Sequence, residues 1–571
     1  MSVRVERTGA APVPGHARQH LVRMRDGTRL ATDVYLPPGH DGTEPPDGTG
    51  LPAVLVRLPY DKNSRYVYFD RAARLFTARG YALVVQDVRG KFRSGGRTLP
   101  FLREPEDGYD TIDWITHQPW SDGAVGMFGD SYYGFTQWAA VAAQHPALRA
   151  IVPRVTTVDF NATTQDPGRD GSGVGRPVWL EGIEYYAHHW VDHGVWDFEP
   201  DRSVRPVIEQ YEQAFQAIGA RSVWFDLLAP RFTDVLHALG RHPFDARPVP
   251  VLHCIGWYDN IGVPHMRDYL ELASRPGWDA VQYLWAGAVD HENYELGRAP
   301  VTDATDHATS DAALERMLPR YAGPALDFFD VFLKGVRPVS SLPKVTWELG
   351  HADWRTARAW PPPGSRERTF WLADPAAAHG PLPGGALADA PPPGEDGARW
   401  VYDPEHLVPS LVPDSFAYLR THPDVSALAA REDVLVFTSP AVTEPLDLAG
   451  PVGVDLHVTG TAPVFDVFAK VLDVSPGGEA RLIVRGQVSV RGDRAPGEVH
   501  VECGHTGYRL RPGHRLALLL AGSDYPMFLP SSGSDENPWT TLAAKPGTQT
   551  LRTGGAHPSR LTVTVLEPPA R

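Results

Sequence analysis

Hydrophobic residues in the first half of the chain form short runs that glycine or proline interrupts. Alternating apolar and polar positions over residues 21–36, around Asp26-Gly27, predict a β-hairpin with a tight turn. The later runs are rich in β-branched and aromatic residues, which is typical of buried strands in a mainly parallel sheet. These runs are 52–58, 80–86, 124–128, 149–155, 248–256 and 280–285.

Helical patterns separate several of these runs. They cover residues 67–78, 107–117 and 132–144, and the last of these is the clearest. Because strands and helices alternate along the chain, the sequence predicts an α/β fold.

The alternation stops between residues 156 and 245. This stretch is rich in tryptophan and tyrosine and contains helical patterns at 204–218 and 222–239. We interpret it as a helical cap inserted into the sheet, above a site. Each aromatic side chain alone is as well explained by packing in the core of the cap itself.

A second change of pattern comes near residues 335–365. From there to the end helices nearly vanish, and short alternating runs at fairly even spacing predict a β-sandwich or jelly roll. These runs are 369–372, 432–438, 452–459, 464–472, 481–490, 498–503, 514–521 and 560–566. Residues 374–396 are rich in proline, glycine and alanine, which predicts an irregular surface loop.

Composition excludes several classes of protein. A chain of 571 residues is too long for one core, and a formal net charge of −15 argues against nucleic acid as a partner. Two cysteines are too few for a disulfide framework. The chain has no secretory signal pattern and no apolar run of about 18 residues, so we expect a cytoplasmic protein without a membrane partner.

Ser131 stands where a predicted strand gives way to a predicted helix. The segment reads Gly-Met-Phe-Gly-Asp-Ser-Tyr-Tyr-Gly, so glycines flank the serine at positions 129 and 134. A sharp turn of this kind exposes a nucleophilic serine and leaves the next backbone N–H, that of Tyr132, facing the reacting carbonyl. A strand-to-helix turn with an incidental serine explains the motif equally well.

Two further residues follow later strands in the order that a serine hydrolase needs. Asp259 comes after the run 248–256, and His291 comes after the run 280–285. An acid that orients a histidine base, in the chain order Ser, Asp, His, favours acyl transfer. Tyr60 follows an early strand, where the phenol can supply a second oxyanion donor or pack beside a proline turn.

The chain resembles the cocaine esterase / X-Pro dipeptidyl-peptidase family of serine hydrolases, which includes the α-amino acid ester hydrolases. The similar segments are MRDGTRLATDVYLP (24–37), RLPYDK (57–62), GYALVVQDVRGKFRSGG (80–96), EDGYDTIDWITHQPWSDGAVGMFGDSYYG (106–134), GWYDN (256–260), DVFLKG (330–335), YDPEHLVPSL (402–411) and REDVLVFTS (431–439). The resemblance implies an α/β-hydrolase domain with a helical cap insertion and a C-terminal β jelly-roll domain. The expected division is 1–155 and 246–340 for the two parts of the α/β-hydrolase core, 156–245 for the cap and 341–571 for the jelly roll.

The resemblance also implies roles for five residues. Ser131 is similar to the nucleophile, Asp259 to the triad acid and His291 to the base. Tyr60, through its hydroxyl, and Tyr132, through its amide, are similar to the oxyanion donors.

Two positions beside these residues depart from what the resemblance leads us to expect. The family usually has Gly-Pro-Trp-x-His, whereas this chain has Gly-Ala-Val-Asp-His at 287–291. Asp130 stands where a small or apolar residue is expected, and we expect it to cap the turn.

We therefore expect a serine hydrolase that cleaves a small-molecule ester or amide, needs no cofactor or metal, and can form a homo-oligomer. Alternatives within the family are an aminopeptidase or X-Pro dipeptidyl-peptidase, and an α-amino acid ester hydrolase or acyltransferase. A metal-dependent hydrolase is a weaker alternative, resting on His189 and His193 four residues apart on a predicted helix. A non-catalytic binding protein with a lectin-like jelly roll is another.

Overall fold

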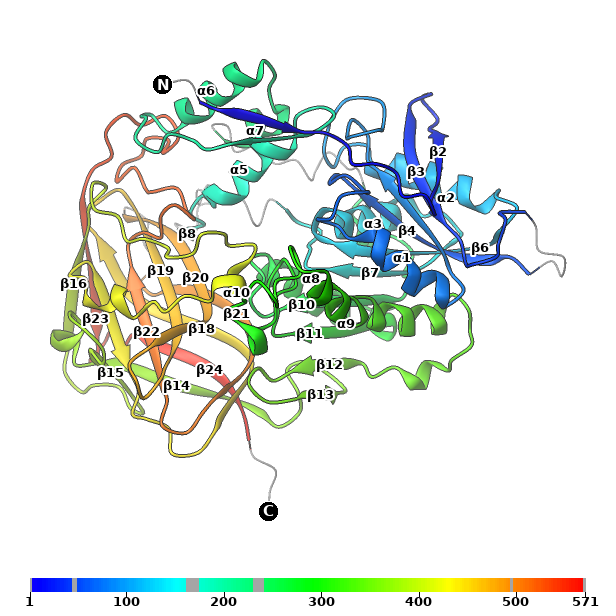
Figure 1. Cartoon of the computed structure of the whole chain (residues 1–571). Helices are drawn as coiled ribbons and strands as arrows, with labels where there is room; N and C mark the ends of the chain where they lie inside the picture. Colours follow the sequence, from blue (N-terminus) through cyan, green and yellow to red (C-terminus); the bar gives the residue numbers. More distant parts are fainter. Residues whose placement is uncertain (1–2, 44–48, 161–173, 230–240, 493–496, 568–571) are drawn as a thin grey trace.

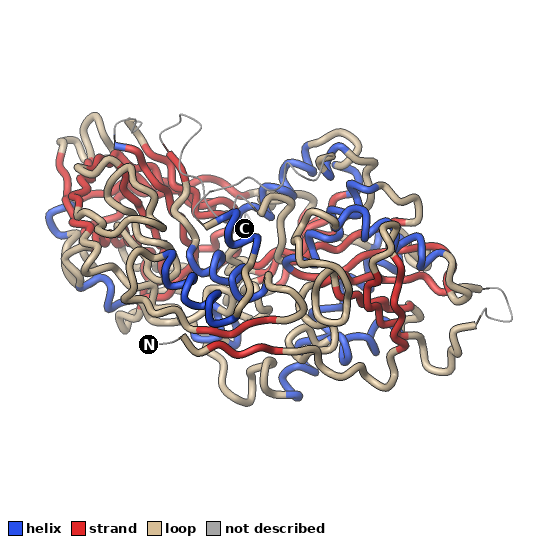
Figure 2. The backbone as a smooth tube through the Cα atoms, turned by 90° about the horizontal axis from the view of Figure 1, so that it is seen from above, coloured by secondary structure: helices blue, strands red, loops and turns tan. Residues whose placement is uncertain are grey.

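The computed structural model describes residues 3–43, 49–160, 174–229, 241–492 and 497–567. Figure 1 shows an α/β part and an all-β part side by side, with a small group of helices above them. Seen from above, in Figure 2, most strands lie in two groups along an elongated molecule, and a further pair lies near the N-terminus between them.

The α/β part is built on one twisted sheet. Its described strands run in the order β13 (Trp354–Ala357), β12 (Val345–Glu348), β11 (Gln282–Gly287), β10 (Val251–Gly256), β7 (Leu148–Arg154), β6 (Ser121–Asp130), β4 (Leu51–Leu58), β5 (Ala82–Asp87), β3 (Arg29–Tyr35) and β2 (Arg18–Arg23). Neighbours from β5 to β12 are parallel, while β2 and β3 form the expected antiparallel hairpin. The predicted α/β fold is confirmed.

Helices bury both faces of this sheet. They are α1 (Phe69–Ala78), α2 (Glu104–Thr116), α3 (Ser131–Ala143), α8 (Gly262–Ser274) and α9 (Asp311–Phe332). Alternate residues of β4 enter different hydrophobic clusters: Val54 and Val56 pack with α1 and α9, whereas Leu55 packs with α2. Because both faces are buried, the strands lack a polar side, which explains their continuous apolar runs.

The stretch expected as a cap contains more than helices. Its described elements are β8 (Val174–Gly175), α5 (Leu180–His189), β9 (Val195–Phe198), α6 (Ile208–Ile218) and α7 (Val223–Leu228). Strand β9 pairs with β1 (Val5–Thr8) at the start of the chain, and β8 pairs with the all-β part. The helix expected over 222–239 is described only as α7, since residues 230–240 lie outside the described ranges.

The all-β part contains the strands that alternation predicted, and three that it missed. Its described elements are β14 (Ser365–Ala373), β15 (Gly385–Ala388), β16 (Asp396–Tyr402), α10 (Tyr418–Thr421), β17 (Val434–Thr438), β18 (Leu446–Gly460), β19 (Val464–Val474), β20 (Ala480–Arg491), β21 (Val499–Leu510), β22 (Arg515–Ala521), β23 (Gly547–Thr553) and β24 (Arg560–Leu566). The missed strands are β15, β16 and β23.

Two sequence-based expectations need correction here. Residues 374–396 are not wholly irregular, because β15 forms inside them by pairing with β14 and β17. Residues 345–357, expected in the jelly roll, instead add β12 and β13 to the edge of the α/β sheet. Alternation reveals a strand but does not say which sheet it joins, so neither pairing could be found from pattern alone.

The two parts share one hydrophobic cluster. Trp257 and Tyr258, from the loop after β10, and Met266 of α8 pack with apolar side chains of the all-β strands. Helix α8 also lies against β21. The loop that follows β10 is therefore held in place from both sides.

Candidate active site

The turn between β6 and α3 holds Ser131 in a strained conformation. Its φ of 52° lies in the left-handed region, which a serine adopts only where the surroundings impose it. Gly129 has a φ of 144°, and a Cβ there would lie 2.0 Å from the Tyr133 ring. A Cβ on Gly134 would lie 2.5 Å from Thr156. The two glycines therefore let the turn close with a tyrosine, rather than a glycine, at position 133.

Hydrogen bonds fix the backbone of this turn from the next strand. The Ser131 N–H donates to the Val155 carbonyl at 3.2 Å, and the Thr156 hydroxyl donates to the Ser131 carbonyl at 2.6 Å. The side chain of Ser131 is left to face the cavity beyond the carboxyl edge of the sheet.

The candidate acid and the candidate base follow neighbouring parallel strands. Asp259 follows β10 and His291 follows β11, so both loops emerge at the same edge of the sheet. His291 Nδ1 lies 2.8 Å from Asp259 Oδ1, and both side chains are almost fully buried. With Nδ1–H donating to Asp259, Nε2 of the neutral imidazole is left as an acceptor.

The charges around His291 decide its proton affinity. Burial alone would lower its pKa, but the charge of Asp259, the hydrogen bond to it, and the charges of Glu292 and Asp130 raise the pKa to about 8. A large fraction of His291 is therefore protonated at neutral pH.

Tyr60 brings a phenol hydroxyl to the same place. The hydroxyl contacts the side chains of Tyr185 and Ser131 and the backbone amide of Tyr132. Burial raises the pKa of Tyr60 to about 12, so the phenol keeps its proton at neutral pH and can donate a hydrogen bond. The Tyr60 hydroxyl and the Tyr132 amide thus converge beside Ser131, the arrangement that stabilises an oxyanion.

Ser131 and His291 line one narrow, largely aromatic cavity. Its lining residues are Tyr60, Phe101, Ser131, Tyr132, Phe160, Trp179, Gly182, Tyr185, Tyr186, Trp190, Ile261, His291 and Phe416. Trp179, Tyr185, Tyr186 and Trp190 come from α5 and its flanks, so the cap region supplies one wall. None of these lining residues is an aspartate or a glutamate.

A buried ring of three polar side chains joins the nucleophile turn to the histidine loop, and the sequence analysis missed it. Arg154 donates from Nε to Asp130 Oδ1 at 2.9 Å and from Nη2 to Asn293 Oδ1 at 2.8 Å. Asn293 Nδ2 donates to Asp130 Oδ2 at 3.0 Å. The expectation that Asp130 caps the turn was wrong, because its side chain accepts no capping bond from α3 and is engaged in this ring. Asp130 ends β6 and Arg154 ends the neighbouring strand β7. The two residues are in register, so their side chains lie next to each other.

Asp290, directly before His291, holds the histidine loop in place through two backbone hydrogen bonds. Its buried carboxylate accepts hydrogen bonds from the Tyr294 N–H at 2.9 Å and the Leu419 N–H at 2.8 Å. The first bond closes the loop around His291, and the second ties that loop to α10 of the all-β part.

The histidine pair that suggested a metal site does not share a helix. Helix α5 ends at His189, and His193 follows in a turn with a φ of 59°. The His189 ring stacks on Tyr185 with centroids 3.7 Å apart, and its Nδ1 lies 3.1 Å from the Tyr185 carbonyl. Among the residues with described positions, no group of three or more His, Cys, Asp or Glu side chains is arranged to hold a metal ion.

The helices of the described ranges include none with the length and apolar character needed to cross a membrane.

Comparisons with known proteins agree with the geometry. The model of the X-Pro dipeptidyl-peptidase (S15) family matches residues 26–293, and that of the X-Pro dipeptidyl-peptidase C-terminal non-catalytic domain matches residues 338–562. The chain is 28% identical over 549 residues to a cocaine esterase of Rhodococcus sp. (strain MB1 Bresler), covering 89% of this chain and 91% of that protein.

Two solved structures share the fold over nearly the whole chain. An aminopeptidase of a marine sediment archaeon, Thaumarchaeota archaeon, has a TM-score of 0.77 at 21% identity, covering 96% of each chain. An α-amino acid ester hydrolase has a TM-score of 0.77 at 22% identity, covering 98% of each chain. At these identities the likeness concerns the fold, an α/β hydrolase with a C-terminal β domain.

Proposed function

Because the chain belongs to the cocaine esterase / X-Pro dipeptidyl-peptidase family of serine hydrolases, we propose that it cleaves carboxylic esters through an acyl-enzyme on Ser131. The observation that carries this proposal is the convergence of Ser131, the His291–Asp259 pair and the Tyr60 hydroxyl on one cavity.

The proposed reaction has two halves. His291 Nε2 takes the proton of the Ser131 hydroxyl as its oxygen bonds to the ester carbonyl carbon, and Asp259 stabilises the imidazolium. The Tyr60 hydroxyl and the Tyr132 amide bind the oxyanion. Collapse of this intermediate breaks the ester bond, and the alcohol leaves with the proton from His291. Water, deprotonated by His291, then attacks the acyl carbon. The bond between that carbon and the Ser131 oxygen breaks, His291 returns the proton to this oxygen, and the acid leaves.

The lining of the cavity supports a neutral, bulky substrate group. Aromatic side chains surround Ser131, and no carboxylate lines the cavity to pair with a substrate ammonium group. An aminopeptidase or an α-amino acid ester hydrolase would need such a partner, because a buried unpaired ammonium is strongly disfavoured. We therefore favour an esterase over these two alternatives.

A matched pair of esters tests this preference. We expect kcat/KM for methyl 3-phenylpropionate to exceed that for methyl phenylalaninate by about tenfold or more, measured at a pH where the α-amino group is protonated. The two esters differ only in the α-ammonium group, so their acyl size and leaving group are controlled. Faster cleavage of the phenylalanine ester would favour the α-amino acid ester hydrolase alternative.

Tyr60→Phe should lower kcat about a hundredfold with little change in KM, because the lost hydroxyl donates mainly to the developing oxyanion. The phenyl ring keeps the edge contacts with Tyr66 and Tyr133, so stability should hold. Tyr66→Phe is the matched control, since it removes a hydroxyl that bonds to Glu292 instead. An unchanged kcat in Tyr60→Phe would remove Tyr60 from the oxyanion hole.

The pH dependence should report the proton on His291. Only the neutral imidazole accepts the Ser131 proton, so kcat/KM should rise with pH and level off above an apparent pKa of about 8. Glu292→Gln should move this rise in kcat/KM to lower pH, because the charge of Glu292 is one of the causes that raise the pKa of His291. A profile that is flat through this range, or a rise that Glu292→Gln leaves in place, would contradict the assignment.

A further inference from the structure

Arg485 on β20 lines two cavities with its guanidinium group. The side chain is half-buried, and within the described ranges it makes no hydrogen bond or ion pair. The Arg485 nitrogens are not among the fully buried polar atoms, and the charge acts on the Glu181 carboxylate, which lines neither of the cavities beside Arg485. The guanidinium group can therefore donate hydrogen bonds to an acceptor that enters a cavity.

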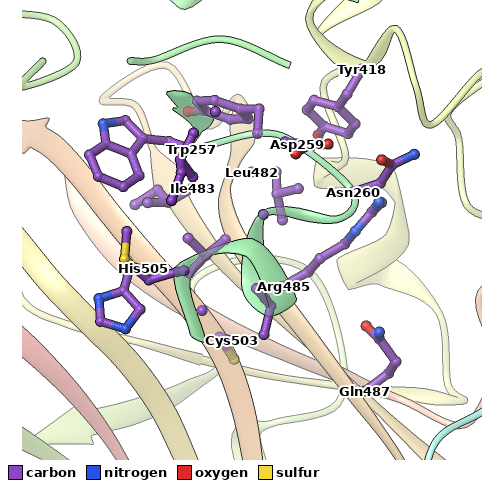
Figure 3. Close-up of a pocket in the computed structure, with 18 residues that line it drawn as sticks. Trp257, Asp259, Asn260, Tyr418, Leu482, Ile483, Arg485, Gln487, Cys503 and His505 are labelled. Atoms are coloured by element: carbon purple, nitrogen blue, oxygen red, sulfur yellow. The ribbon is translucent and has the colours of Figure 1, made fainter. Parts of the chain in front are cut away.

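Two adjoining cavities meet at Arg485, between the α/β and all-β parts. The inner cavity, of about 70 Å³, is drawn in Figure 3. The outer cavity has a volume of about 300 Å³, enough for a small organic molecule. The residues that line both are Asn260, Val263, Arg485 and Gln487.

Asn260 adds a second unsatisfied polar group at this junction. Both its amide nitrogen and its amide oxygen are buried and have no hydrogen-bond partner among the described residues. In Figure 3 the Arg485 side chain extends from its strand toward Asn260, and Gln487 stands farther along the same strand. Three polar side chains that can donate hydrogen bonds therefore line the same space.

The outer cavity is basic, although the whole chain carries a net charge of −15. Arg176, Arg267 and Arg485 line it, against the single carboxylate of Glu502. Arg267 and Glu502 form an ion pair with each other, so the Glu502 carboxylate does not pair with Arg485. A planar anion is the ligand that a guanidinium group binds with two parallel hydrogen bonds.

We propose that the outer cavity binds a small molecule through its carboxylate, with Arg485 as the main ligand and Asn260 and Gln487 as further donors. The inner cavity is less suited to the anion, because Asp259 lines it and would repel a second negative charge. Trp179 lines both the outer cavity and the cavity of Ser131, so the two sites are neighbours. The carboxylate can belong to the acid that ester cleavage releases or to a substrate with a free carboxyl group.

Calorimetric titration with benzoate tests the site, because binding does not require Ser131 to be active. The intact protein should bind benzoate saturably, and Arg485→Gln should weaken binding about ten- to hundredfold. Arg491→Gln, six residues along the same strand and paired with Asp535, should bind as the intact protein does. No saturable binding, or equal loss in both variants, would overturn the proposal.

Benzoate can also enter the aromatic cavity at Ser131, so the titration is repeated on protein whose active serine is blocked by a fluorophosphonate. Binding that survives blocking and still depends on Arg485 supports a separate site. Binding that disappears on blocking would place benzoate at Ser131 and overturn the proposal. A protein that takes up no fluorophosphonate would contradict the proposed function alone. The benzoate affinities of the intact protein, Arg485→Gln and Arg491→Gln could still be compared, because that titration does not require an active serine.

Kinetics distinguish the two sources of the carboxylate. If the substrate supplies it, Arg485→Gln should lower kcat/KM for monoethyl succinate at least about tenfold relative to ethyl butyrate. If the released acid supplies it, Arg485→Gln should instead raise the inhibition constant of benzoate by a similar factor. Neither effect, with benzoate binding also unchanged, would remove any role for the cavity.

Discussion

Ser131→Ala should lower ester hydrolysis by about 10⁴- to 10⁶-fold, because removing a triad nucleophile removes the covalent route altogether. The oxyanion donors and the aromatic cavity stay in place, so residual catalysis and substrate binding should persist. Steady-state kinetics of the variant on an ester that the intact protein cleaves would measure the loss.

Ser121→Ala is the matched control for this variant. Ser121 begins β6, the strand that ends at the nucleophile turn, so it lies at the opposite edge of the sheet. The control should retain full activity. Ser131→Ala protein that folds normally and keeps more than about a hundredth of the activity would show that another group attacks the substrate.

Arg154→Met should destabilise the α/β part by about 3–5 kcal/mol, because it leaves the Asp130 carboxylate buried without its charged partner. Arg154 is 2% exposed and also lies over the Tyr321 ring, with Cζ 4.6 Å from the centroid. Methionine keeps much of the packing but none of the hydrogen bonds. Urea denaturation, followed by tryptophan fluorescence, would measure the change in the free energy of unfolding.

The double variant Asp130→Asn/Arg154→Met separates charge from packing. Asn at position 130 removes the charge that Arg154→Met leaves uncompensated, and its side-chain amide can still form a hydrogen bond with Asn293. The double variant should therefore recover a large part of the stability lost in Arg154→Met. Activity should stay reduced in both variants, since the ring positions the turn of Ser131 relative to His291. An Arg154→Met protein as stable as the parent would show that the buried pair contributes little.

Much of the fold could be predicted because the local pattern of apolar and polar residues was sufficient to locate its strands and helices. The strands that precede Ser131, Asp259 and His291 are buried on both faces, so their continuous apolar runs identified them as strands. Because these strands are parallel, the residues that follow them lie at one edge of the sheet. The nucleophile turn was also visible, since Gly129 and Gly134 stand where a Cβ has no room.

The polar network and the cavities could not be predicted, because they depend on pairs of residues far apart in sequence. Asn293 reaches Asp130 across 163 positions of the chain, and nothing in either local sequence signals the contact. The assumption that an acid before a helix caps it misled the interpretation of Asp130. Likewise, Arg485 and Asn260 line the same cavities only because the all-β part packs against the loop after β10.

Fluorophosphonate labelling, followed by mass mapping of the labelled peptide, is the most direct test of whether Ser131 is an activated nucleophile. We expect one label, on Ser131, that is lost in Ser131→Ala, is added much more slowly in His291→Ala and is unaffected by EDTA. Absence of label on the intact protein, or label that persists in Ser131→Ala, would contradict it.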